Sequence, residues 1–138
     1  NDAVHYGDQD WGGKDFARFG TDSAGYHQAI ELEHQVINEC LATDLSAQKI
    51  QKFVSYTVKE KNYKEYNWTW CGRYSVPFGL LTGFYLQKLE KKDPLKGELI
   101  GYHTSIDQEH LKVDDIGLGV TAPANLHHWV GYVGIGYY

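Results

Sequence analysis

The spacing of apolar residues changes near Lys61, and this change constrains the fold more than any other feature of the chain. Before it, apolar residues recur every three or four positions, which predicts amphipathic helices over residues 23–41 and 45–60. After it, the chain is aromatic, β-branched and interrupted by glycine. This composition predicts strands at the following positions: residues 66–75, 80–90, 98–106, 115–121 and 127–137. The turn-forming residues 93–97 predict a hairpin between the second and third of these strands.

The order of these elements predicts a single α+β domain over residues 1–138. Helices followed by strands, without alternation, favour two N-terminal amphipathic helices packed on a mainly antiparallel sheet of about five strands. The domain would comprise an irregular lead-in (residues 1–21), a helical part (22–61) and a β-rich part (62–138). No apolar run approaches the roughly 20 residues of a membrane-spanning helix, so no transmembrane segment is expected.

Composition suggests export from the cell. The chain has no Met and two Cys, which is typical of a mature protein whose signal peptide has been removed. We therefore expect a secreted or extracellular protein with a disulfide between Cys40 and Cys71; two buried free thiols are the alternative. Asn67 begins an Asn-x-Thr sequon, whose glycosylation matters only in a eukaryotic secretory route.

Charge is distributed in three blocks. The net charge of −5 is the sum of about −7 over residues 1–48, +6 over 49–96 and −4 over 97–138, which predicts charge complementarity across the folded surface. An acidic chain argues against nucleic acid as the main partner. A local basic strip capable of touching phosphates remains, formed by Lys88, Lys91, Lys92 and Lys96.

Glu33 is the most anomalous polar residue, because a helical wheel places it within the apolar stripe of the first predicted helix. A buried, unpaired carboxylate costs several kcal/mol, so a partner is expected. The candidates are His103, His110, Arg73 or a Tyr hydroxyl. An imidazole in an open cleft would make Glu33, His103 and His110 a catalytic acid–base site, whereas Arg73 or a Tyr would make Glu33 structural.

A second polar group lies on the same helix. His27, Glu31 and His34 are spaced i, i+4 and i+7, so they form one row along the helix. Such a row is able to hold Zn²⁺ or a similar divalent metal, which would be the cofactor of a metal-dependent enzyme. A solvated helix flank is the alternative interpretation.

Aromatic residues are abundant, with eleven Tyr and four Trp, and some are expected on the surface. Exposed Tyr and Trp on a rigid sheet offer contact area to sugars and peptides. The predicted ligand-binding residues are Trp68, Trp70, Tyr74 and Trp129. We therefore expect a secreted binding or effector module, such as a toxin-like domain, that engages a carbohydrate or protein ligand. The alternative is a small metal-dependent hydrolase with a His/Glu/Asp site.

Overall fold

The computed structural model describes residues 2–11, 16–107 and 124–138, and it has an α+β architecture. In chain order the elements are β1 (Asp2–Tyr6), α1 (Ser23–Val36), the π-helical turn η2 (Ile37–Leu41), β2 (Thr43–Asp44), α2 (Ala47–Thr57), β3 (Val58–Lys59), β4 (Asn62–Tyr66), α3 (Ser75–Glu90), β5 (Lys96–Thr104) and β6 (Trp129–Tyr137). The predicted strand over residues 115–121 lies outside the described residues.

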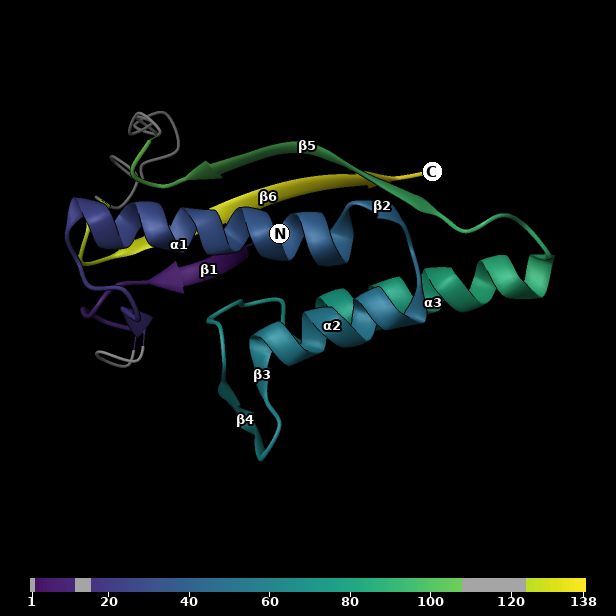
Figure 1. Ribbon diagram of the computed structural model, residues 1–138, viewed down its shortest axis with the longest axis horizontal. Coiled ribbons are helices and arrows are strands. Elements are labelled where there is room, and N and C mark those ends of the chain that lie inside the picture. The colour runs from purple at the N-terminus through teal and green to yellow at the C-terminus, as the bar shows by residue number, and fades with distance from the viewer. Residues whose placement is uncertain (1, 12–15, 108–123) are drawn as a thin grey trace, which may run out of the picture.

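The described residues form two antiparallel sheets. The larger sheet has the strand order β1-β6-β5-β2, and β3 pairs with β4 in a separate hairpin. In Figure 1, α1 runs along the larger sheet, while α2 and α3 lie together on the other side of the molecule and the end of α3 extends away from it. The core between these layers includes fully buried side chains of Tyr6, Phe53, Trp70 and Trp129.

Both helices predicted before Lys61 are present, and each begins at a capping residue. The second ends at Thr57, short of the predicted residue 60, because residues 58–59 form β3. The Asp22 side chain accepts a 2.8 Å hydrogen bond from the Gly25 amide at the start of α1. Ser46 accepts a 3.3 Å hydrogen bond from the Lys49 amide at the start of α2. These bonds satisfy amide groups that have no partner within the first helical turn. The predicted first helix reaches residue 41 because η2 continues α1 with a π-helical turn.

The prediction of a strand over residues 80–90 is wrong, because these residues belong to the third helix, α3. Pro77 lies in its first turn, where the missing amide costs no hydrogen bond. Lys91 ends the helix in the left-handed conformation at φ 54°, and the Lys92 amide bonds the Gln87 carbonyl. Residues 93–95 therefore connect a helix to β5, which begins at Lys96, so residues 93–97 do not form a hairpin. The helices are not both N-terminal.

The remaining strand predictions are confirmed in part. Antiparallel β5 and β6 cover most of the predicted strands 98–106 and 127–137. The predicted strand 66–75 is replaced by the last residue of β4, a connecting segment and the first residue of α3. The lead-in predicted as irregular contains β1, whose Ala3, Val4 and Tyr6 are buried.

The predicted disulfide is absent, since Cys40 and Cys71 are both free. Cys40 is buried in η2, and burial raises the pKa of its thiol to about 11. Cys71 follows the buried Trp70 and lies on the surface. Cys71 begins the turn that precedes α3. Secretion loses the support of a disulfide and stays a prediction.

Candidate functional site

The Glu33 carboxyl is enclosed in the core, and its partners are indoles. Its Oε1 accepts hydrogen bonds from the Nε1 atoms of Trp68 and Trp70, each at 2.5 Å. Its Oε2 accepts one from the Val4 amide at 3.2 Å. These bonds tie α1 to β1 and to the segment before α3. The two indoles were not among the expected partners, which were His103, His110, Arg73 or a Tyr hydroxyl. Of these, the Tyr102 hydroxyl lies beside the Glu33 carboxyl and helps to lower its pKa.

Burial dominates the electrostatics of Glu33. Desolvation raises the pKa of its carboxyl to about 7, although the two indole donors and the Val4 amide oppose the shift. The Tyr102 hydroxyl and Glu33 Oε2 both lie beside Gly131, where a Cβ atom would come within 2.5 Å of that hydroxyl. Glycine is therefore required at position 131 for this close approach.

The predicted catalytic set is not assembled among the described residues. Glu33 is fully buried, so no substrate can reach it in this conformation. His103 is exposed, and its Nδ1 lies 4.0 Å from Asp107 Oδ2. His110 lies outside the described residues. The geometry of Glu33 is that of a structural hydrogen-bond acceptor.

The predicted aromatic platform is also absent, because three of its four members are core residues. Trp68, Trp70 and Trp129 are each at most 2% exposed. Their indoles pack on Phe19, Phe53 and Tyr6 respectively. Tyr74 is half exposed, and its hydroxyl donates a hydrogen bond to the Tyr63 carbonyl. The sequence shows that these residues are aromatic but does not show that they are buried.

The predicted metal-binding row remains a line of exposed side chains on α1. His27, Glu31 and His34 are all exposed. The His34 ring packs against Tyr102, with ring centroids 5.1 Å apart. Within the described ranges, the side chains whose potential metal-ligand atoms lie close together are not in this row. They lie on β1 and on the segment before α3.

The outer face of α3 is the most unusual surface of the described residues. Its exposed large apolar residues are Phe78, Leu81, Tyr85, Leu86 and Leu89. They recur at i, i+3, i+7, i+8 and i+11, which places them in one stripe along the helix. Phe78 is 75% exposed and Leu89 is 82% exposed. A stripe of this kind normally faces a core, but here it faces solvent, which makes it a candidate interaction surface.

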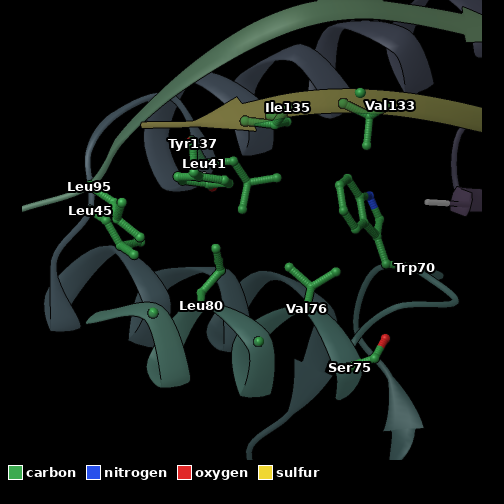
Figure 2. A pocket seen from close by; sticks show the side chains of 13 residues that line it. Leu41, Leu45, Trp70, Ser75, Val76, Leu80, Leu95, Val133, Ile135 and Tyr137 are labelled. Carbon is green, nitrogen blue, oxygen red and sulfur yellow. Dashed lines mark hydrogen bonds between the residues drawn. The ribbon is translucent and has the colours of Figure 1, made fainter. Parts of the chain in front are cut away.

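The inner face of α3 lines an apolar groove of about 510 Å³. Figure 2 shows Val76 and Leu80 of α3 facing Val133 and Ile135 of β6 across this groove. Leu41, Leu45 and Leu95 line one end, and Trp70 lies at the other. In α3 itself, Pro77 is buried while most of the other apolar side chains are not. Packing within the described chain therefore does not account for the apolar character of this helix.

Charges flank the apolar stripe but do not interrupt it. The chain carries no charged residue from position 74 to 87 and no acidic residue from 66 to 89. Arg73 precedes α3, and Lys88, Lys91 and Lys92 lie at its end. Lys92 also pairs with Glu90 at 2.6 Å on the surface. The resulting site is an exposed apolar helix face bordered by positive charge at both ends.

Sequence reasoning missed this site because it assigned residues 80–90 to a strand. The sequence does contain a signal that would identify this helix. It is the long uncharged run combined with the helical spacing of Phe78, Leu81, Tyr85 and Leu89. Comparison with known proteins adds no assignment: no family model, curated protein or solved structure matches this chain. In the part of the chain that the structure describes, no helix has the length and apolar character needed to cross a membrane.

Proposed function

We propose that this protein binds the surface of an anionic lipid membrane through α3. The observation that carries the proposal is the solvent-facing apolar stripe of α3 with lysines at its end. At a membrane surface, the outer apolar stripe of α3 would lie at the acyl boundary and its terminal lysines at the headgroups, while the inner face of the helix stays on the groove of the protein. Tyr74 and Tyr85, both exposed, have the amphipathic rings that favour this depth.

Charge favours a lipid surface over a second copy of the chain. Two α3 helices packed in parallel would bring their terminal lysines together. Packed antiparallel, they would bring those lysines near Arg73 of the other copy. Either arrangement juxtaposes like charges, whereas anionic headgroups complement them. Each Lys near an anionic membrane contributes about 1 kcal/mol, so Lys88 and Lys91 together would strengthen binding roughly thirtyfold. Lys92 adds little, because its charge is paired with Glu90.

The proposal keeps the idea of a binding module and changes its ligand. A carbohydrate platform of Trp68, Trp70 and Trp129 has no support, since these indoles lie in the core. The hydrolase alternative has no support from Glu33 or from the row on α1, because neither forms an open catalytic cleft with another predicted residue among those that the structure describes. The exposed aromatics that favour binding are those on and beside α3.

Sedimentation with lipid vesicles tests the proposal. The protein is expected to sediment with vesicles of phosphatidylcholine and phosphatidylserine, and to remain in solution with phosphatidylcholine alone. Raising the salt concentration should weaken binding, because screening reduces the attraction of the lysines. The double variant Phe78→Gln/Leu89→Gln should bind at least tenfold more weakly.

Ile100→Gln is the matched control, because Ile100 is 77% exposed but lies on β5. It should bind like the wild type. The proposal is overturned if the wild type ignores anionic vesicles or if the α3 variant binds as well as the control. A dimer in solution that Phe78→Gln/Leu89→Gln dissociates would assign the stripe to a second copy and would also overturn it.

A further inference from the structure

Three side chains with metal-binding atoms converge at the edge of β1. They are Asp2, His5 and Cys71, and one ligand atom from each lies within 4.8 Å of the others. Asp2 and Cys71 are exposed, and His5 is partly buried. The group combines a carboxylate, an imidazole and a thiol, and it is separate from α3 and from the predicted row on α1.

The backbone brings these residues together by pairing β1 with the segment before α3. The His5 amide donates to the Thr69 carbonyl at 2.9 Å, and the Cys71 amide donates to the Ala3 carbonyl at 3.1 Å. Val4 and Trp70 form the antiparallel bridge between these two bonds. The pairing fixes Cys71 beside β1 although the two segments are far apart in sequence.

An irregularity in β1 allows Asp2 and His5 to face the same place. In a regular strand, residues three positions apart point to opposite faces. The pairing of β1 with β6 shifts register between Asp2 and His5, as at a β-bulge. Such an irregularity redirects a side chain and is common beside functional sites. It brings Asp2 Oδ2 to 3.7 Å from His5 Nε2.

His5 Nε2 is buried and makes no hydrogen bond to any described residue. The 3.7 Å separation from Asp2 is longer than a hydrogen bond. The Trp11 ring packs edge-on against the imidazole at 4.5 Å and restricts its orientation. Buried polar atoms nearly always have a partner, so a hydrogen-bond donor, acceptor or metal ion is expected at His5 Nε2.

We propose that Asp2, His5 and Cys71 form a site for a divalent metal ion of the zinc class. Thiolate, imidazole and carboxylate together suit Zn²⁺ better than Mg²⁺ or Ca²⁺, which prefer oxygen ligands alone. Three protein ligands leave the fourth tetrahedral position to water. Metal–ligand bonds of about 2.0–2.3 Å place ligand atoms roughly 3.5 Å apart, so small rotations of the exposed Asp2 and Cys71 side chains complete the site.

Cobalt and zinc titrations of the full chain, with a non-thiol reductant present, test the proposal. Adding Co²⁺ should produce a thiolate-to-cobalt charge-transfer absorption with one ion per chain, and Zn²⁺ should displace it. Cys71→Ser should abolish this absorption. His5→Gln and Asp2→Asn should each weaken Zn²⁺ binding by more than about tenfold, because even changes outside the ligand shell cost that much.

His27→Gln is the matched control, since it removes an exposed histidine from the row on α1, and it should bind Zn²⁺ like the wild type. Circular dichroism should confirm that each variant is folded. Asp2→Asn keeps the test decisive if His5→Gln fails to fold, because Asp2 is exposed and its replacement is nearly isosteric. The proposal is overturned if the wild type shows no charge-transfer absorption or if the absorption persists in Cys71→Ser. It is also overturned if Asp2→Asn binds Zn²⁺ with unchanged affinity.

Discussion

Glu33 joins three parts of the core through one carboxyl group. Its oxygens accept from Trp68, Trp70 and Val4, so the residue links α1, the segment before α3 and β1. The helical wheel was sufficient to predict that Glu33 is buried. Its partners were not predictable, because an indole N–H is a weak signal in sequence and the fold alone decides which indoles meet the carboxyl.

The raised pKa of Glu33 predicts a pH-dependent stability. Below about pH 4.5 the carboxyl is protonated in both the folded and the unfolded chain. Between pH 4.5 and about 7 the unfolded chain ionises while the folded chain keeps its proton, so the free energy of unfolding falls as pH rises. The difference in pKa corresponds to roughly 3 kcal/mol at neutral pH.

Glu33→Gln should remove this dependence. Its amide keeps an acceptor for the indoles but turns a donor toward the Val4 amide, which costs about 1–3 kcal/mol. The variant should therefore melt several degrees below the wild type at pH 4.5. The difference between their melting temperatures should become smaller by pH 8. Thermal unfolding followed by circular dichroism measures both, with the exposed Glu31→Gln as control. Parallel melting profiles for wild type and Glu33→Gln would contradict this account.

The two cysteines should differ in reactivity. A thiol reagent should label Cys71 rapidly in the native protein and Cys40 only after unfolding, because Cys40 is buried and its pKa is raised to about 11. Intact-mass measurement before and after denaturation counts the labels. Cys71→Ser should show no native label. The free-thiol structure would be refuted if neither cysteine were labelled in the native protein because the two were joined in a disulfide.

At the scale of elements, periodicity predicted α1 and α2 but not α3. The first two helices alternate polar and apolar faces and start at Asp22 and Ser46. In α3 one apolar face lines the groove and the other faces solvent, so the helix lacks the polar face that identifies an amphipathic helix. Its aromatic and glycine residues then resemble those of a strand. The candidate interaction surface on α3 was missed for the same reason.

Glycine replacements in α3 test its helical state. Gly79→Ala should raise the free energy of unfolding by about 0.5–1 kcal/mol, since a Cβ there meets no atom within 4 Å and alanine favours a helix. Gly83→Ala should gain less, because its Cβ would lie 3.0 Å from Leu95 Cδ1. Urea unfolding measures both. If Gly79→Ala destabilised the protein, residues 75–90 would not be a helix in solution.

At the scale of the whole molecule, charge and apolar surface are distributed unevenly. The predicted basic block over residues 49–96 includes α3 and its terminal lysines, while the blocks on either side are acidic. The α+β class and the antiparallel sheet followed from the sequence. The position of α3 at the periphery did not, because it depends on which apolar faces the larger sheet and α1 already cover.

Spin labels on α3 and on β5 would test the central claim most directly. In a Cys71→Ser background, Leu89→Cys places a label on the apolar stripe and Ile100→Cys places one on β5, while the native Cys40 is buried. On adding anionic vesicles, the label at position 89 should become accessible to oxygen and shielded from a water-soluble relaxing agent. The label at position 100 should stay in water. Both labels remaining in water would contradict membrane binding through α3.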